Sequence, residues 1–394
     1  MSHSPAILIT VSGPDSPGIT SALTKVLSDS QAKILDIGQS VIHGLLSLSI
    51  LFESKEGGHN TLKELLFKST EMGLKMDFKL IQSQETKNAP KTRYAITLIG
   101  DDISASALHE VTEVLAQTTT NIDTIERLSQ SDFGCVQMLL SSETPINQSD
   151  LRKKLLEIAR IQKVDIALQT EGLFRRAKRL VVMDMDSTLI QNEVIDEMAK
   201  HLGVYDEVAS VTEKAMNGAM DFDESLKLRV SKLKGMKESD THEVFQKLKL
   251  TSGAEDLIRV LKKLGYKIAL ISGGFSIVAD QFKEKLGIDY AYANQLEMIN
   301  GICTGNVIPP IVNAQRKSDL LEVIAQQENI HLNQVIAIGD GANDLQMLEK
   351  AGLGIAFNAK PVVSQQADLS YNQKNLKSIL YLLGIPSHEQ SELL

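Results

Sequence analysis

Hydrophobic and polar positions in the first part of the chain recur with an offset of 88 residues. The offset places the strand-like run AILITVSG near the N-terminus onto YAITLIGD at 94. It also places Leu23 and Leu27 onto Val111 and Leu115, at the spacing of one face of a helix. The pattern therefore predicts a duplicated unit of strand, helix, strand and further elements.

Each copy of this unit is about 80 residues long, which suits a ferredoxin-like βαββαβ module. We therefore predict two α+β domains, at residues 1–84 and 92–172. The polar stretch SQETKNAPKTR, at residues 83–93, is typical of a linker between such modules.

After residue 172 the pattern changes to aliphatic strand-like runs separated by long helical stretches. RLVVMD, YKIALIS and QVIAIGD each end in Asp or Ser and are each followed by a turn or helix. This alternation predicts a Rossmann-like α/β domain at 175–394, with functional side chains at the carboxyl ends of parallel strands. The stretch from Gln191 to Leu264 has no convincing strand, although one βαβ unit needs only about 30 residues. A helical insert within about 194–256 is therefore expected.

Composition narrows the possible classes of protein. A chain of 394 residues with 43% hydrophobic content is expected to form two or three globular domains. A net charge of -9 and a pI near 5.5 argue against a general nucleic-acid or membrane-surface binder. Cys135 and Cys303 lack metal-binding spacing and predict free thiols in a reducing compartment. With no apolar run near the ~20 residues of a membrane span, we expect a soluble cytoplasmic protein.

Polar residues gather at or just after the predicted strand ends. They are Asp184 and Asp186; Ser272, Gly273 and Gly274; Lys317; and Asp340, Asn343 and Asp344. In a parallel sheet these ends lie side by side, so several carboxylates would surround one lysine and repel one another. A divalent cation would relieve the repulsion, and Mg²⁺ fits best because it prefers oxygen ligands and substrate phosphate.

This set of side chains is suited to phosphoryl transfer. A carboxylate beside Mg²⁺ can attack phosphorus while a neighbouring acid protonates the leaving oxygen, and Asp184 and Asp186 could fill these roles. The Ser272 hydroxyl and the backbone N–H groups of Gly273 and Gly274 can donate to phosphoryl oxygens. Lys317 would supply the positive charge on which such a transfer depends.

Four motifs, DMDSTLI, ISGGFS, RKSD and GDGAND, resemble in that order the motifs of the haloacid dehalogenase superfamily of phosphatases. The resemblance implies that Asp184, which opens a DxDxT pattern completed by Thr188, is a nucleophile that forms an aspartyl phosphate. It implies that Asp186 is the general acid and then the general base. By the same resemblance Mg²⁺ is held by the Asp184 side chain, the Asp186 backbone carbonyl and Asp340. Asp344 is expected to support these ligands.

NEVIDEMA, MDFDESLKLRV and SGGFSIVAD are similar to one family of this superfamily, the phosphoserine phosphatases, whose insert is a small helical cap. The resemblance implies hydrolysis of O-phospho-L-serine to L-serine and phosphate, the last step of serine biosynthesis. It implies that Glu193 meets the substrate ammonium and Arg229 its carboxylate, which a guanidinium can bind bidentately. It further implies that Phe222 shields the site from water and that Asn343 contacts substrate or nucleophile.

The two N-terminal copies resemble ACT domains, small regulatory modules that bind amino acids, often between copies. Gly13, Asp15 and Gly18 in GPDSPGI match the ligand loop of that family. The second copy has Asp101 and Ser106 where the first has glycines, so its binding of a ligand is open. The resemblance implies an amino-acid effector such as serine, and a homodimer.

Simpler interpretations of the same residues stay open at this point. A lone DxD can be a solvated strand end, Glu193 and Arg229 can be exposed helix residues, and Phe222 can be core. The enzymatic alternative is a phosphatase or phosphotransferase acting on another small phosphomonoester. An alternative of another class is a catalytically inert protein that senses amino acids.

Overall fold

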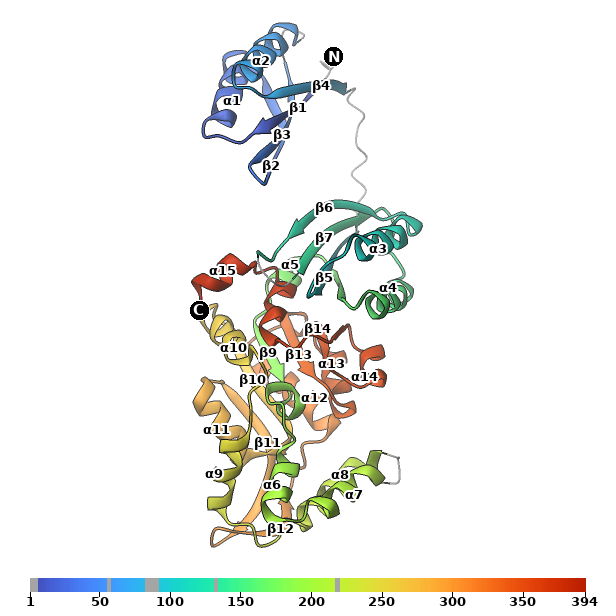
Figure 1. Ribbon diagram of the computed structural model, residues 1–394, viewed down its shortest axis with the longest axis vertical. Helices are drawn as coiled ribbons and strands as arrows, with labels where there is room; N and C mark the ends of the chain where they lie inside the picture. Colours follow the sequence, from blue (N-terminus) through green and yellow to red (C-terminus); the bar gives the residue numbers. More distant parts are fainter. Residues whose placement is uncertain (1–5, 55–57, 82–91, 131–133, 217–219) are drawn as a thin grey trace. The chain divides into compact units, whose positions relative to one another are not determined.

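The computed structural model describes residues 6–54, 58–81, 92–130, 134–216 and 220–394 (Figure 1). Two compact units divide the chain, Met1–Ala89 and Pro90–Leu394. The predicted linker at 83–93 lies outside the described residues up to residue 91, and its last two residues, Thr92 and Arg93, already belong to a strand.

The first unit is a βαββαβ module, as the sequence predicts. Its elements are β1 (Ala6–Pro14), α1 (Ile19–Asp29), β2 (Lys33–Ile42), β3 (Leu45–Glu53), α2 (His59–Glu71) and β4 (Lys75–Ile81). The strands form an antiparallel sheet in the order β2-β3-β1-β4. Alternation along β1 buries Ile7, Ile9 and Val11 against Leu23 and Leu27 of α1, which explains the strand and helix periods in the sequence.

The second copy repeats this order of elements. They are β5 (Thr92–Gly100), α3 (Ala105–Gln117), β6 (Asn121–Arg127), β7 (Gly134–Ser142), α4 (Gln148–Gln162) and β8 (Asp165–Thr170). Its sheet has the order β6-β7-β5-β8, so the predicted duplication is confirmed. Here both faces of β5 are buried: Leu98 packs with Val111 and Leu115, whereas Ile99 joins the core of the parallel-sheet domain.

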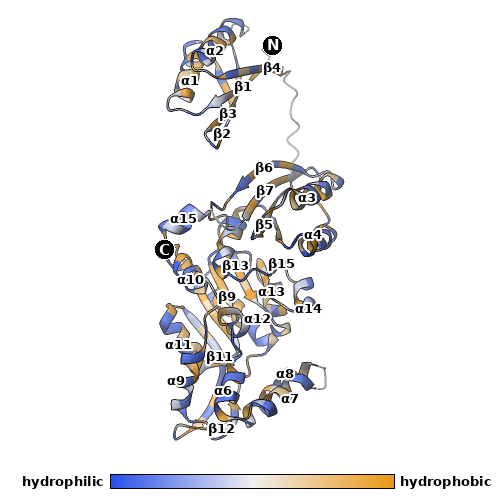
Figure 2. Ribbon diagram, in the orientation of Figure 1, coloured by the Kyte–Doolittle hydropathy of each residue, from blue (hydrophilic) through white to orange (hydrophobic). Residues whose placement is uncertain are grey.

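The remaining chain forms a seven-stranded, mainly parallel sheet, which confirms the predicted α/β core. Its strands are β9 (Leu180–Met183), β10 (Lys267–Phe275), β11 (Tyr290–Ile299), β12 (Ile302–Ile308), β13 (Val335–Gly339), β14 (Leu353–Phe357) and β15 (Leu369–Tyr371). The order is β12-β11-β10-β9-β13-β14-β15, and Figure 2 shows hydrophobic residues concentrated on β9, β10 and β13. The sequence did not predict the hairpin that pairs β12 antiparallel with β11.

Further helices precede, connect or follow these strands. They are α5 (Leu173–Arg176), α10 (Ala254–Lys263), α11 (Ser276–Leu286), α12 (Ala314–Gln327), α13 (Leu345–Lys350), α14 (Pro361–Gln366) and α15 (Ser387–Glu392). In the described ranges, no helix is both long and apolar enough to cross a bilayer. Cys135 and Cys303 are buried and unpaired, as expected.

Between β9 and β10 the chain forms an insert of four helices. They are α6 (Val194–Leu202), α7 (Tyr205–Met216), α8 (Phe222–Ser231) and α9 (Glu238–Lys247). The Asp221 side chain caps α8 by accepting a hydrogen bond from the Glu224 backbone N–H at 2.8 Å. Helix α8 contacts β12, so the unpredicted hairpin supports the insert from the sheet side. The predicted bounds of the insert, about 194–256, stay a prediction.

Candidate active site

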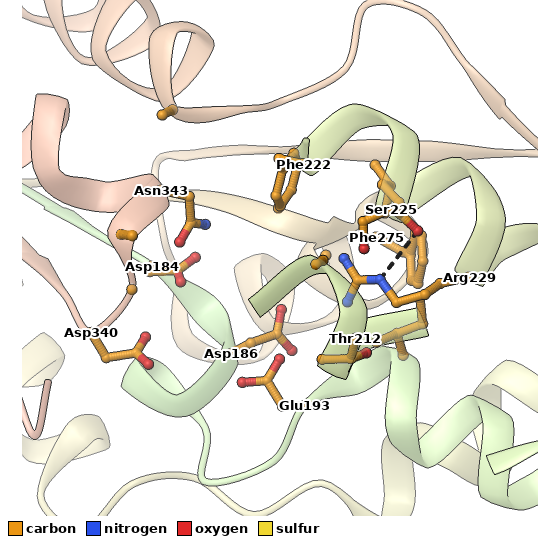
Figure 3. Close-up of a pocket in the computed structure, with 18 of the residues that line it drawn as sticks. Asp184, Asp186, Glu193, Thr212, Phe222, Ser225, Arg229, Phe275, Asp340 and Asn343 are labelled. Carbon is orange, nitrogen blue, oxygen red and sulfur yellow. Dashed lines mark hydrogen bonds between the residues drawn. The ribbon is translucent and has the colours of Figure 1, made fainter. Parts of the chain in front are cut away.

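The parallel pairing of β9 and β13 brings two of the predicted acidic positions together. Asp184 directly follows β9, and its backbone N–H donates to the Ile338 carbonyl of β13 at 2.9 Å. Asp340 directly follows β13, so both carboxylates come from adjacent carboxyl ends of the sheet. After Asp184 and Asp186 the chain turns sharply at Ser187, whose φ of 55° lies in the left-handed region. Figure 3 shows the Asp184 and Asp186 carboxylates at different places in the site.

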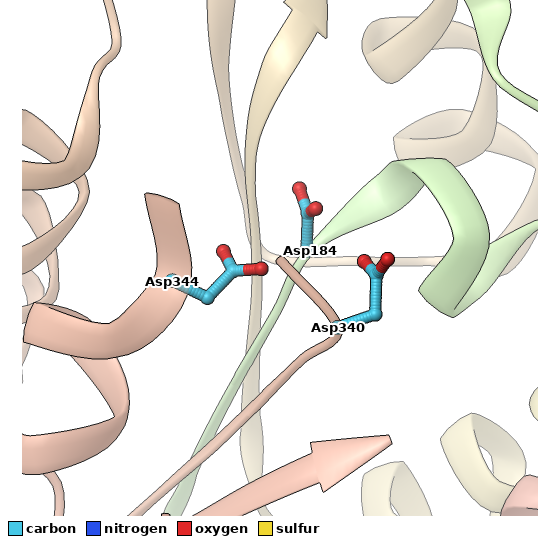
Figure 4. Close-up of side chains that lie close together, drawn as sticks. All are labelled: Asp184, Asp340 and Asp344. Carbon is cyan, nitrogen blue, oxygen red and sulfur yellow. The ribbon is translucent and has the colours of Figure 1, made fainter. Parts of the chain in front are cut away.

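Three carboxylates, those of Asp184, Asp340 and Asp344, form a compact cluster (Figure 4). Each offers an oxygen within 4.8 Å of the others. The fully buried Lys317 Nζ lies 2.7 Å from Asp184 Oδ1 and donates to Asp344 Oδ1 at 2.7 Å. The second Asp344 oxygen accepts from the Gly341 N–H at 3.0 Å. Both Asp344 oxygens are thus engaged by the protein, which leaves Asp184 and Asp340 better placed to bind a cation.

The cluster carries more negative charge than one lysine balances. Burial and the Asp344 carboxylate raise the pKa of Asp184 well above its usual range, although Lys317 opposes this. Burial, with Asp344 and Glu193, raises the pKa of Asp340 to about 7. A bound divalent cation would reverse both effects, because it favours the ionised carboxylates. Donors that are all oxygens, around such a charge, fit Mg²⁺.

Asp186 has a different environment, made of neutral donors. Its Oδ1 accepts from the Val194 N–H at 2.7 Å, and its Oδ2 accepts from the Ser272 hydroxyl at 3.2 Å. The Gly274 N–H in turn donates to the Ser272 oxygen at 2.8 Å. Burial, then the nearby Glu193 carboxylate, raises the pKa of Asp186 to about 7. A carboxyl group with this pKa can hold or release a proton near neutral pH.

The two aspartates open into a cavity of about 510 Å³ (Figure 3). Its lining includes these residues predicted from the sequence: Asp184, Asp186, Glu193, Phe222, Arg229, Gly273, Asp340 and Asn343. Ser272, Lys317 and Asp344 lie behind this lining and are fully or almost fully buried. A side chain on Gly273 would come within 3.0 Å of the Phe222 ring, so α8 of the insert closes tightly over this strand end.

Glu193 and Arg229 lie in the same cavity and influence each other electrostatically. Ser187 donates to Glu193 Oε1 at 2.7 Å, and Arg229 Nε donates to the Ser225 carbonyl at 3.4 Å. Burial raises the pKa of Glu193, against the attraction of Arg229 and Lys360. Burial also lowers the pKa of Arg229, against the attraction of Glu193. Beyond the aspartates the cavity therefore holds the anionic Glu193 and two cations, Arg229 and Lys360.

The sequence interpretation missed other residues of this cavity, among them Thr212, Ser225 and Lys360. Lys360 follows β14, a strand that the sequence analysis did not identify. The rule that functional side chains follow parallel strands could have found it, had that strand been recognised. Thr212 and Ser225 lie on insert helices and carry no comparable signal.

The predicted regulatory loop belongs to the first unit. Gly18 adopts a left-handed φ of 98° at the start of α1, and the Asp15 N–H donates to the Gly44 carbonyl at 2.8 Å. A side chain on Gly13 would come within 2.7 Å of Leu74. In the second copy Ser104 caps α3 instead. Ligand binding by Gly13, Asp15 and Gly18 stays a prediction.

Comparisons with known proteins agree with this architecture. The family described as haloacid dehalogenase-like hydrolase matches residues 181–349, and ACT domain families match residues 6–79 and 92–169. The phosphoserine phosphatase of Streptomyces coelicolor is 42% identical over 98% of this chain and 93% of its own length. That of Mycobacterium tuberculosis is 37% identical over 98% of this chain and 94% of its own length.

Solved structures show the same similarity. A haloacid dehalogenase family hydrolase from Salmonella enterica superposes with a TM-score of 0.66 at 29% identity, covering 74% of this chain and 98% of that one. A substrate-bound phosphoserine phosphatase complex gives 0.50 at 44% identity, covering 52% and 97%. The parallel sheet with its acidic strand ends is thus that of a haloacid dehalogenase-like hydrolase, here preceded by tandem ACT domains. Within this class the chain belongs to the phosphoserine phosphatase family.

Proposed function

We propose that this chain hydrolyses O-phospho-L-serine to L-serine and phosphate in a Mg²⁺-dependent reaction. The observation that carries the proposal is the single cavity shared by Asp184, Asp186, Glu193 and Arg229. One end offers two aspartates for phosphoryl transfer, and the other offers Glu193 and Arg229 for the two charges of a zwitterion. Relatives that span nearly the whole chain are named phosphoserine phosphatases, which supports the same assignment.

Binding of the substrate follows from charge. The phosphate would lie beside Asp184, where Lys317 supplies positive charge and the Gly273 N–H supplies a hydrogen-bond donor, while the Gly274 N–H donates to the Ser272 oxygen. The ammonium would pair with Glu193, and the carboxylate would bind the planar guanidinium of Arg229. Phe222, packed over Gly273, would exclude water from the reacting end.

The chemistry divides between the two aspartates. An Asp184 oxygen attacks phosphorus and the bond from phosphorus to the seryl oxygen breaks, while Asp186 gives its proton to that oxygen. L-Serine leaves and an aspartyl phosphate remains. Asp186, now ionised, takes a proton from water as the water oxygen attacks phosphorus, which releases phosphate and restores both carboxyl groups.

The Asp184 and Asp340 side chains and the Asp186 backbone carbonyl would hold Mg²⁺. When bound, the ion neutralises charge on the phosphate and favours the ionised Asp184. Asp344, with both oxygens engaged by Lys317 and Gly341, would hold the lysine in place rather than bind the ion directly.

A substrate comparison tests the assignment. Arg229→Ala is expected to lower kcat/KM for phosphoserine by about 100-fold or more, because the substrate carboxylate loses its partner. Hydrolysis of p-nitrophenyl phosphate, which has no such carboxylate, should change by less than about threefold. Lys227→Ala, at an exposed position of the same helix, is the matched control. If both substrates lose activity equally, Arg229 does not recognise the carboxylate, and another phosphomonoester or a phosphoryl acceptor other than water should be sought.

Regulation by an amino acid is the second part of the proposal. We propose that the ACT copies bind an effector such as serine, as the ACT family matches suggest. Serine should then change the rate of phosphate release or the thermal stability of the full chain, and Gly18→Val in the predicted loop should abolish that response.

The predicted homodimer and cytoplasmic location stay predictions. Detectable turnover that Asp184→Asn abolishes would exclude an inert sensor.

A further inference from the structure

A second cavity, of about 380 Å³, lies where the second ACT copy meets the phosphatase domain. We call it the joint cavity. The ACT side contributes residues of α4 and β8, and the segment that follows contributes residues 171–175. From the phosphatase side come Lys178, Asn333, Gly352 and Asp368, which lie just before β9, β13, β14 and β15. The joint cavity is therefore at the amino ends of the parallel strands, the opposite edge of the sheet from the active site.

Positive charge predominates in the joint cavity. Arg152, Arg175 and Lys178 line it together with the carboxylates of Glu171 and Asp368. Asp368 Oδ1 pairs with Arg152 Nη2 at 2.9 Å. The Glu171 carboxylate forms ion pairs with two arginines, Arg175 and the exposed Arg176.

Two of these cations are almost fully withdrawn from solvent. Arg175 is 7% exposed and Lys178 is 5% exposed. Burial lowers the pKa of Lys178 to about 8, and the nearby Arg175 adds to this effect while Asp368 opposes it. Lys178 donates one hydrogen bond, to the Asn333 carbonyl at 2.7 Å. Charge buried in this way normally has an anionic partner for each cation, and here the cations outnumber the carboxylates.

Two buried guanidinium nitrogens beside the joint cavity also lack hydrogen-bond partners among the described residues. Within the described parts of the chain, Arg175 Nη1 and Arg152 Nε are buried and have no hydrogen-bond partner. A buried donor without a partner costs about 1–3 kcal/mol, so native proteins rarely leave two in one place. The two guanidinium groups come from different elements, α4 and α5, and line the same cavity.

We propose that the joint cavity binds a small oxyanion, a phosphate or carboxylate group, between Arg175 and Arg152. Such a group accepts several hydrogen bonds and balances the excess positive charge, and guanidinium groups match its planar or tetrahedral oxygens. The bound anion would link α4 of the ACT copy to the segment that enters β9. This site is independent of the proposed hydrolysis, and its test does not use turnover.

Hydrogen exchange of the full-length protein, followed by mass spectrometry, locates such binding. Inorganic phosphate is compared with chloride at equal ionic strength. At a phosphate concentration ten times its dissociation constant, exchange in peptides covering 148–156 and 171–178 should slow by up to about tenfold, because ligand binding favours the closed state. Peptides around Asp184 and Asp340 report separately on phosphate in the active site.

Variants assign the effect to the guanidinium groups. Arg175→Met should remove the protection of the peptides covering 148–156 and 171–178 and leave the protection of the active-site peptides unchanged. Arg152→Met, at a partly exposed position, should do the same. Arg259→Met, an exposed arginine of α10, should retain both. Circular dichroism verifies that each variant is folded, and Arg152→Met decides the question if Arg175→Met does not fold.

Serine and phosphoserine, used as separate probes, distinguish the sources of the oxyanion. Protection by serine but not by phosphate would assign a carboxylate, and the reverse would assign a phosphate. Absence of protection of the joint peptides by any of the three probes overturns the proposal. Equal protection in wild type and in the folded Arg152 or Arg175 variants overturns it as well.

Discussion

At the scale of single residues, the site turns on how differently Asp184 and Asp186 are surrounded. The two are one residue apart in sequence, yet Asp184 contacts the buried ammonium of Lys317, whereas Asp186 is held by a backbone N–H and a hydroxyl. An ammonium favours the ionised carboxylate, whereas burial and the Glu193 carboxylate favour the protonated form of Asp186, against its two hydrogen-bond donors. The proposed division into nucleophile and proton donor follows from this difference.

Asp184→Asn tests the proposed role of Asp184 both in Mg²⁺ binding and in phosphoryl transfer. The amide has no charge to attract Mg²⁺ and is a poor nucleophile, so turnover should fall by at least about 10³-fold. Mg²⁺ should raise the thermal midpoint of the wild type, because it binds only the native site, and should raise that of the variant much less. Thermal unfolding with and without Mg²⁺ measures this, with exposed Asp206→Asn as the control. Equal Mg²⁺ shifts in both proteins would contradict the proposed ligand set.

Gly274→Ala tests how closely the backbone approaches Asp186. A Cβ at this position would lie 2.6 Å from Asp186 Oδ2 and 2.9 Å from the Met185 side chain. Asp186 would have to move, so we expect kcat to fall by about 100-fold or more even though one methyl group is added. Gly38→Ala, where no atom lies within 4 Å, should leave kcat unchanged. Steady-state kinetics of both variants measures the effect, and normal activity of Gly274→Ala would show that Asp186 need not keep this position.

At the scale of elements, the sequence predicted the duplicated N-terminal units and the strands that have a regular hydrophobic pattern. The βαββαβ order of both copies and the strand ends carrying Asp184, Ser272 and Asp340 follow from local patterns of hydrophobic residues. The hairpin of β11 and β12 was not predicted, because β12 is partly exposed on the sheet edge and carries no continuous hydrophobic run. Lys360 was missed because β14, the strand before it, carries none of the four motifs. Which neutral donors surround Asp186 depends on contacts between distant segments, which no local pattern encodes.

The cap of helix α8 provides a test at this scale. Asp221→Ala removes the acceptor of the Glu224 N–H and should destabilise the helix by about 1 kcal/mol. Because α8 carries Phe222 and Arg229, its fraying should accelerate hydrogen exchange in α8 and raise KM for phosphoserine. Asp221→Asn, which keeps an acceptor, is the control. Unchanged exchange in the alanine variant would mean that packing alone holds α8 in place.

At the scale of the whole molecule, the second ACT copy shares a core with the phosphatase domain. Ile99, Leu128 and Cys135 belong to the same buried cluster as the helices and strands of the parallel sheet. Polar contacts to the buried Asp165 reinforce the joint: the Asn372 N–H and side-chain amide donate to its carboxylate at 2.9 and 3.0 Å. Asp165 and Asn372 are far apart in sequence, and a polar residue at a strand start is ordinarily solvated, so this contact could not be predicted.

We expect Asp165 to make the joint between the second ACT copy and the phosphatase domain sensitive to pH. Burial raises its pKa to about 6, although the hydrogen bonds from Asn372 oppose this, whereas the unfolded value is about 3.9. Between these values the native state binds more protons than the unfolded state. The stability gained by protonation is therefore present at low pH and is lost as the pH rises through about 6.

Comparison with Asp165→Asn isolates this contribution, because the amide does not titrate and the other ionisable groups are common to both proteins. From about pH 5 to about pH 8 the wild type should lose roughly 1.4 kcal/mol of opening free energy relative to the variant. Hydrogen exchange in β8 and β15, measured on the full chain at both pH values, gives this difference. An identical pH dependence in the two proteins would show that Asp165 is charged at both pH values and that the joint tolerates a buried carboxylate without cost.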